Sequence, residues 1–414
     1  MRSLIIAVTT LAPASAMAGG YLVPSAAPRE VGLGQAATAA QDGPEAVLLN
    51  TAALAGQDGF AAGFGGEVLN NRTEWSDPML GSAKQSQTNT PIGIAASYGA
   101  RLDNGMGWGV GVGFGTPAGG SLGWPKGWPG QEVILSVDQK VFGFGGGVAF
   151  QPLPFLKLGA SYVRFQATEE LHQSLNFLDH FADAGIALSG GANSFGLATE
   201  LSVPTVPLKI GATFSYRAKI PLEGDAHFEG VPPGFQTLLH DQTVTEELII
   251  PSVFTVGAAY EAMPGFKLMA NYELENWSIY HADVFKGGDG EFNVRVPRNY
   301  KDAHVIRAAG EYARLPFMQE LTLRAGVLRS ISDQPKDTIS PSLTDASSWA
   351  ISLGGGYDIM PNLRVDVGYQ HAFFDKVTAE PGSEAFPGSY KTNVDIVSVG
   401  ISWRMAMKPM APVE

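Results

Sequence analysis

The 414-residue sequence contains no cysteine, few charged residues and no long apolar run in its main part. The lack of cysteine excludes disulfides, thiol catalysis and thiolate metal sites. Charged residues make up 16% of the chain, against roughly a quarter in soluble proteins, which is too few for a surface wetted on all sides. No run beyond the N-terminus approaches the ~18 apolar residues of a membrane helix, so a helical membrane protein is excluded. The net charge of −13 argues against a nucleic-acid partner.

Glycine is abundant instead, and it recurs at every second position from Gly105 to Gly115. Because side chains in a strand alternate between two faces, this segment predicts one face of large apolar groups and one face of bare backbone. Such a strand is typical of a wall with lipid outside and a closely fitted segment inside. The segment therefore favours a transmembrane β-barrel.

A second strand, residues 141–150, repeats the pattern, with Gly143 and Gly145 on its bare face. The two faces admit two explanations. They either leave room for a plug inside the barrel, or they mark a lateral gate for which we single out Gly109, Gly111, Gly113, Gly143 and Gly145.

The chain divides into four parts. Residues 1–18 read as a signal peptide, with Arg2, an apolar run from Leu4 to Leu11 and an Ala16-Met17-Ala18 cleavage site. Residues 19–57 are rich in small residues and do not alternate, which predicts an N-terminal hatch of short helices inside the lumen. Residues 58–405 form the predicted barrel, and residues 406–414 form a tail.

Turn signals predict about fourteen strands with strictly alternating connections. Short connections are expected at 102–105, 151–154, 203–207, 262–265, 314–317 and 358–362, and long ones at 71–90, 116–137, 169–191, 221–242, 282–300, 332–346 and 376–388. Tight turns at one end and long loops at the other indicate an up-and-down barrel in a bacterial outer membrane. We expect this barrel to be monomeric.

Enzymatic signals are weak. Gly119-Gly-Ser121-Leu-Gly123 fits a nucleophile motif, but no helix is predicted after it. The seven histidines are scattered without metal-ligand spacing, and no cofactor motif follows a strand. We expect no enzyme, no metal and no cofactor.

The predicted outer loops carry apolar residues. Leu171, Leu175, Phe177, Leu178, Phe181 and Ile186 recur at a helical period, and Phe228, Val231, Phe235, Leu238 and Leu239 follow in the next loop. They either pack on each other as loop helices or contact membranes and hydrophobic ligands.

The sequence resembles the FadL/TodX family of outer-membrane transporters for long-chain fatty acids and other hydrophobic compounds. The N-terminal resemblance lies in Gly32-x-Gly-x-Ala-x-x-Ala39 and in Ala46-Val-Leu-Leu-Asn50-Thr51-Ala52, where Thr51 replaces the proline of the family's hatch motif. Further matches are Leu248–Ser252, Gly257–Tyr260, Asn276–Ser278, Tyr300–Asp302, Leu323–Gly326 and Ser340–Trp349. Ser347 and Ser348 stand where the family usually has an arginine, and a tail follows Trp403.

The resemblance implies a plugged channel for hydrophobic molecules. Asn50, Thr51 and Ala52 then belong to the hatch, while Leu175, Leu178, Phe181, Phe235 and Leu238 belong to the capture site in the outer loops. The implied route ends at a lateral opening in the wall. The expected partners are a fatty acid or similar ligand and outer-membrane lipid; the alternatives are aromatic hydrocarbons, a general porin or a barrel phospholipase.

Lys301 is the expected anchor for an acidic head group, since it shares strand parity with Val305 and Arg307 and occupies the basic position of the resemblance. It could equally pair with Asp302 or a lumenal glutamate. Arg307 and Arg324 are weaker candidates, because we expect Glu273 and Glu311 to neutralise them.

Overall fold

The computed structural model describes residues 20–405 apart from residues 25, 103, 178, 291, 333 and 381–385. The predicted signal peptide, the tail and the candidate Leu178 lie outside the described residues. None of the helices in this part of the chain is long and apolar enough to cross a membrane.

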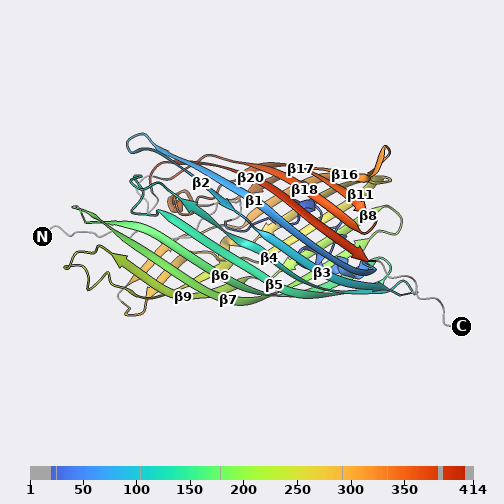
Figure 1. Ribbon diagram of the computed structural model, residues 1–414, viewed down its shortest axis with the longest axis horizontal. Helices are drawn as coiled ribbons and strands as arrows, with labels where there is room; N and C mark the ends of the chain where they lie inside the picture. Colours follow the sequence, from blue (N-terminus) through green and yellow to red (C-terminus); the bar gives the residue numbers. More distant parts are fainter. Residues whose placement is uncertain are drawn as a thin grey trace.

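Antiparallel strands close into a barrel, shown from the side in Figure 1. Within the described residues, nineteen of the twenty labelled strands make up fourteen wall strands, as predicted. In chain order the wall consists of β1 (Gly59–Asp77), β2 with β3 (Gly81–Asn89, Ile92–Arg101), β4 (Gly107–Gly123), β5 (Ser136–Leu153), β6 (Leu156–Asn176), β7 (Phe181–Ser202), β8 with β9 (Leu208–Ser215, Ala218–Glu229), β10 with β11 (Gln242–Ile250, Val253–Met263), β12 with β13 (Phe266–Glu275, Ala282–Gly287), β14 with β15 (Asn293–Pro297, Ala303–Leu315), β16 (Met318–Ile331), β17 (Ser348–Met360), β18 (Leu363–Phe374) and β20 (Ser389–Met405). A short β19 (Val377–Thr378) pairs with β20.

The wall closes where β1 pairs with β20, from Phe60 opposite Met405 to Ser76 opposite Ser389. Side chains alternate along each strand, so that Phe64, Val112, Leu197 and Val399 are exposed on the outer face. Without water in the bilayer, every backbone group of the wall needs a partner, and closure supplies one. Rings of aromatic side chains, such as the pairs Phe60–Trp403 and Tyr98–Trp108, lie near the tight-turn end.

All six predicted tight turns are present at one end of the barrel, for example between Ser202 and Leu208. The prediction of a loop helix across residues 171–186 is wrong, because β6 and β7 continue there as a hairpin with Leu175 opposite Ala182. Leu171, Gln173 and Leu175 are buried at alternate positions. The spacing of these few residues fits both a helix and a strand, and the pairing between β6 and β7 stabilises the strand. The connection at 71–90 is likewise a hairpin of β1 and β2.

The loop end of the lumen is filled by a large buried cluster, which we call the roof. It includes Tyr21, Trp75, Trp128, Trp277 and Tyr300. Trp124 stacks on Trp128 at 4.5 Å, and Tyr21 meets Trp277 edge to face at 5.1 Å. The three-residue helices η2 (Trp277–Ile279) and η3 (Lys336–Thr338) belong to the connections that build this end.

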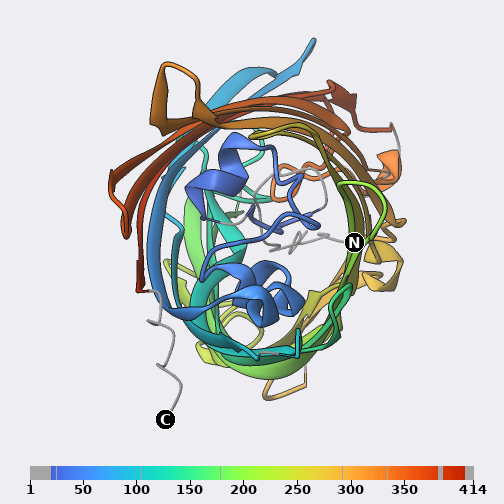
Figure 2. The same cartoon turned by 90° about the vertical axis from the view of Figure 1, so that its right-hand side faces the viewer.

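The N-terminal segment lies inside the barrel, as the view along the barrel in Figure 2 shows, and most of it lies toward the tight-turn end (Figure 1). Its described part, residues 20–57, is the hatch and contains α1 (Pro28–Gly32), α2 (Ala46–Leu49) and η1 (Thr51–Gly56). Side chains such as Val31, Leu33, Ala46 and Leu54 are buried against the wall. The predicted fold, a barrel with an internal hatch, is thus confirmed.

Candidate functional site: a hatch, a lumenal cavity and a gap in the wall

Glycines on the inner wall make room for the hatch. A Cβ atom on Gly109 would overlap the carbonyl of Leu54, and one on Gly111 would come within 3.1 Å of Val47. On the opposite side, the Cα atom of Gly32 would lie 2.8 Å from a Cβ at position 354. Further inner-wall glycines that meet hatch atoms in this way are Gly65, Gly99, Gly107, Gly113, Gly147, Gly159, Gly211, Gly326, Gly368 and Gly400. The close approach of hatch and wall therefore accounts for the bare faces of these strands.

The predicted gate glycines fall into two groups. Gly109, Gly111 and Gly113 lie against the hatch, which favours the plug explanation for this strand. Gly143 and Gly145 border a cavity above the hatch. A Cβ on Gly145 would overlap the carbonyl of Tyr162 on the neighbouring strand, so this glycine also serves the packing of the wall.

Hydrogen bonds shape the hatch around Asn50. Its side-chain oxygen accepts a hydrogen bond from the Ala52 N–H at 3.2 Å, which caps η1, and its amide donates to the Thr38 carbonyl at 2.7 Å. Asn50, Thr51 and Ala52 are buried, and the Thr51 hydroxyl donates to Val47 at 3.4 Å. Asn50 thus joins two stretches of the hatch that lie 12 residues apart.

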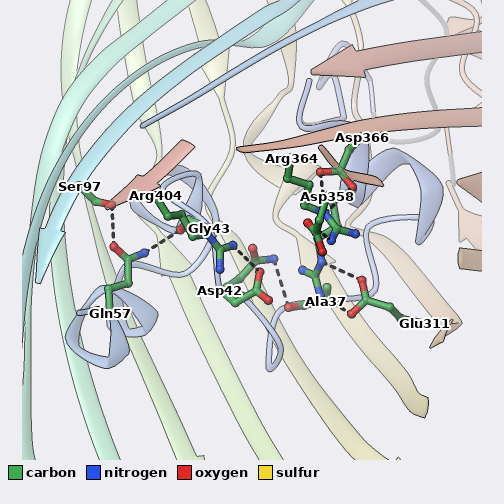
Figure 3. Close-up of polar contacts among 12 residues, drawn as sticks. Ala37, Asp42, Gly43, Gln57, Ser97, Glu311, Asp358, Arg364, Asp366 and Arg404 are labelled. Carbon is green, nitrogen blue, oxygen red and sulfur yellow. Dashed lines mark hydrogen bonds and ion pairs between the residues drawn. The ribbon is translucent and has the colours of Figure 1, made fainter. Parts of the chain in front are cut away.

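Ion pairs fasten the hatch to the wall (Figure 3). Arg29 on α1 donates from Nε and Nη2 to the two carboxylate oxygens of Glu311, each at 3.0 Å. Arg324 donates to Glu311 at 2.7 Å and to Asp366 at 2.6 Å. Burial raises the pKa of Glu30, although the adjacent Arg29 opposes this shift. Arg324, expected as a weaker head-group candidate, is therefore part of the hatch attachment.

Between the roof and the hatch lies a cavity of about 390 Å³, which we call the lumenal cavity. Hatch residues Val47, Leu48 and Thr51 border it on one side, and Ile250 and Pro251 on another. Aliphatic, aromatic and small side chains dominate its lining, which is typical of sites for apolar ligands.

The charged residues that line the lumenal cavity are Arg307, Glu273 and Glu275. Arg307 Nη2 pairs with Glu273 at 2.6 Å, and Thr255 donates to the same carboxylate at 2.9 Å. The Trp277 indole donates to Glu275 at 2.8 Å. Lys301, the expected anchor, precedes β15 with an exposed side chain and is not among the lining residues.

The wall has a gap between its second and third strands, which we define by Thr90, Pro91 and residues 116–119. The ladder of β3 and β4 ends at Gly93 opposite Gly115, and no ladder joins β2 to β4 in the described part. Pro91 separates β2 from β3, and β4 bulges between Gly115 and Ala118. A second cavity of about 190 Å³ lies at this wall gap.

The start of the hatch covers the wall gap from inside. Val23 N–H donates to the Pro117 carbonyl at 3.0 Å, and Gly119 N–H donates to the Tyr21 carbonyl at 2.9 Å. Val23, Ile92 and Thr116 border both cavities. Sequence reasoning missed this site, although Pro91 and Pro117 in adjacent strands were a usable signal, since proline interrupts a ladder.

Some of the outer-loop candidates belong to one buried cluster. Leu175, Ala182, Ala184, Val231 and Leu239 are buried together, with Phe177, Phe228 and Phe235 packed against them. Phe181 and Leu238 remain exposed, by 51% and 41%. Ser121, from the nucleophile-like motif, lies within β4 and donates to Asn89 at 2.8 Å.

The model of one protein family, described as outer membrane protein transport protein (OMPP1/FadL/TodX), matches residues 9–406. The chain belongs to this family. It is accordingly a protein of the outer membrane, as predicted.

Solved structures of the same fold include a Pseudomonas aeruginosa FadL homologue, at 16% identity and a TM-score of 0.81, covering 93% of this chain and 99% of that chain. The Pseudomonas putida toluene transporter TodX is 16% identical with a TM-score of 0.74, covering 95% of this chain and 99% of that chain. The 47 kDa outer membrane protein of Pasteurella multocida is 25% identical over 162 residues, which span 39% of this chain and 36% of that protein.

Proposed function

We propose that this family member takes up small hydrophobic molecules by passive diffusion through the outer membrane. The observation that carries the proposal is the lumenal cavity, an apolar space enclosed between the roof and the hatch. A water-filled porin needs a continuous polar passage, whereas here both ends of the lumen are packed with side chains. One barrel contains both cavities, so we expect a monomer to suffice.

The charges of the lumenal cavity favour uncharged ligands. Two carboxylates and one guanidinium line it, and the guanidinium is already paired with Glu273. A fatty-acid carboxylate entering this space would be desolvated beside a guanidinium that is already paired with Glu273. Uncharged hydrocarbons, including aromatic ones, avoid that cost of desolvation.

Fatty acids are the second candidate, and Arg307 supports them. Its Nε is buried and has no hydrogen-bond partner among the described residues. A carboxylate could accept from this donor with a charge-assisted bond. The head-group anchor that we expected at Lys301 would in that case be Arg307.

The proposed route begins at the exposed Phe181 and Leu238 at the loop end of the barrel, passes the lumenal cavity and ends at the wall gap. The two cavities share the bordering residues Val23, Ile92 and Thr116. Val68 and Ile94 on the strands beside the wall gap are exposed, so the gap would open toward the membrane. An apolar molecule would thus enter the bilayer directly, without crossing water. Residues Tyr21–Val23 would have to move for this step.

The hatch would block passage through the tight-turn end of the barrel. It covers the tight-turn half of the lumen, and a barrel of this size is otherwise wide enough for water. Deleting residues 20–57 should therefore produce an ion-conducting pore in planar bilayers. If the deletion variant conducts no more than the intact protein, the hatch does not block the lumen.

Uptake into cells tests the function itself. Cells lacking the protein and cells producing it are compared for uptake of a radiolabelled aromatic hydrocarbon and of a labelled long-chain fatty acid. The proposal expects faster hydrocarbon uptake with the protein present. Equal hydrocarbon uptake in both cell types contradicts the proposal, and acceleration of the fatty acid alone supports the second candidate.

A further inference from the structure

Two arginines lie on the outer wall where its apolar band ends. On β6 the outward positions run from Leu158 through Ala160 and Tyr162 to Arg164, which is the first charged residue of the series above the turn. On the seventh wall strand the outward residues run from Ile210 to Tyr216, and Arg217 follows. Both arginines lie on the loop side of the bilayer, where lipid head groups are expected.

Arg164 is held by the neighbouring strand. Its Nη1 donates to the Asn193 side-chain oxygen at 3.2 Å, and the Tyr162 hydroxyl donates to the same oxygen at 2.9 Å. A Cβ on Gly191 would come within 2.6 Å of Arg164 Nη2, so the guanidinium lies close over this glycine. The geometry leaves Arg164 partly exposed toward the membrane surface.

Arg217 lies on the other side of the same stretch of β7. Its guanidinium lies 5.8 Å from the Tyr216 ring centre, and that ring stacks on Phe195 at 4.9 Å. The Ser194 hydroxyl donates to the Tyr216 carbonyl at 2.5 Å, which ties the Arg217 segment to β7. Since Arg164 and Arg217 flank one strand, the ladder spacing separates their backbones by about 10 Å.

Several other cations on the outer face have acidic partners. Arg72 pairs with Asp395, Arg329 with Asp375 at 3.0 Å, Lys140 with Asp138 at 2.6 Å, and Lys219 with Glu247 at 2.7 Å. Arg164 and Arg217 have no ion pair with any residue that the structure describes, and each is only partly exposed. An uncompensated guanidinium beside hydrocarbon is unfavourable unless an anion from the membrane approaches it.

We propose that Arg164 and Arg217 form a binding site for the phosphate group of an outer-leaflet lipid. Guanidinium groups match phosphate oxygens with paired hydrogen bonds, and they remain charged at all relevant pH values. The aromatic rings of Tyr162, Phe195 and Tyr216 lie directly on the membrane side, where they would contact the acyl chains. Free phosphate offers the same oxygens, but it lacks the chains that would occupy this aromatic surface.

The test uses the intact protein in detergent and native mass spectrometry with three probes: bis-phosphorylated lipid A, a diacylglycerol without phosphate, and inorganic phosphate as competitor. The variant is Arg164→Gln with Arg217→Gln, and the matched control is Arg72→Gln, which removes an acid-paired arginine from the same face. Heat-dependent gel mobility verifies that each barrel is folded. A second variant, Arg164→Lys with Arg217→Lys, keeps the charge.

Wild-type protein and Arg72→Gln should bind lipid A, while the double glutamine variant should lose at least about tenfold in affinity. The lysine variant should retain part of the binding, and diacylglycerol should bind weakly to all proteins. Unchanged lipid A binding in the folded glutamine variant overturns the proposal. Equal binding of diacylglycerol, or complete competition by inorganic phosphate, also overturns it, because the site would then recognise chains alone or phosphate alone.

Discussion

Arg29 of the hatch and Glu311 of the wall form an ion pair with two hydrogen bonds, each 3.0 Å long. The two residues are 282 positions apart in sequence, and both side chains are largely buried. Breaking a buried pair is destabilising because the remaining charge loses its partner. This contact is therefore a principal attachment of the hatch.

Replacing Arg29 should loosen the hatch and leave the barrel intact. Arg29→Gln removes two charge-assisted bonds, while Glu311 keeps Arg324, so we expect a loss of about 3 kcal/mol of local stability. Hydrogen exchange of the peptides spanning residues 20–57 should accelerate by about a hundredfold. Arg364→Gln, which affects pairs with Asp358 and Asp366 within the wall, is the control. Equal protection of the hatch in wild type and Arg29→Gln would show that the pair does not hold it.

Glycine packing against the hatch allows a matched comparison. A methyl group at Gly109 would overlap Leu54, whereas one at Gly66 would have its closest neighbours at 3.9 Å. Gly109→Ala should displace η1 and raise ion conductance in planar bilayers, and Gly66→Ala should behave like wild type. Both variants should insert normally. If Gly109→Ala conducts no more than Gly66→Ala, the inner glycines do not set the position of the hatch.

The two cationic candidates should differ in their effect on ligands. We expect Arg307→Gln to weaken fatty-acid binding by about tenfold or more, which corresponds to one charge-assisted bond, with a much smaller effect on an uncharged hydrocarbon. Lys301→Met should change neither, because Lys301 lies outside the lumenal cavity lining. The measurement is the affinity of the wild type and of both variants for a fatty acid and for an uncharged hydrocarbon. A selective loss of fatty-acid binding in Lys301→Met would restore Lys301 as the anchor.

Local patterns in the sequence predict much of this fold. Alternation at positions 105–115 and 141–150 indicates wall strands, and turn residues such as Val203–Pro207 mark one end of the barrel correctly. These features depend on near neighbours in the chain. The small-residue segment before β1 also indicates a hatch, because it lacks alternation.

Such local patterns do not predict contacts between segments that are distant in the sequence. Gly354 and Gly368 meet the hatch only because the barrel closes, and Arg324 binds Glu311 and Asp366 from two neighbouring strands. The parity of Lys301 does not hold, since β15 begins at Ala303 and the preceding residues are not in the ladder. Leu171 and Leu175 satisfied both a helical and a strand spacing, and only pairing with β7 distinguishes them.

The most direct test of the proposed route is a disulfide across the wall gap. The Asn89 and Ser121 side chains meet at 2.8 Å between β2 and β4, and the chain has no other cysteine. Hydrocarbon uptake is measured for Asn89→Cys with Ser121→Cys, oxidised and then reduced, with each single variant as a control. The account predicts that the oxidised double variant takes up hydrocarbon no faster than cells lacking the protein, and that reduction restores uptake. Uptake at the wild-type rate while the disulfide is intact would contradict exit through the wall.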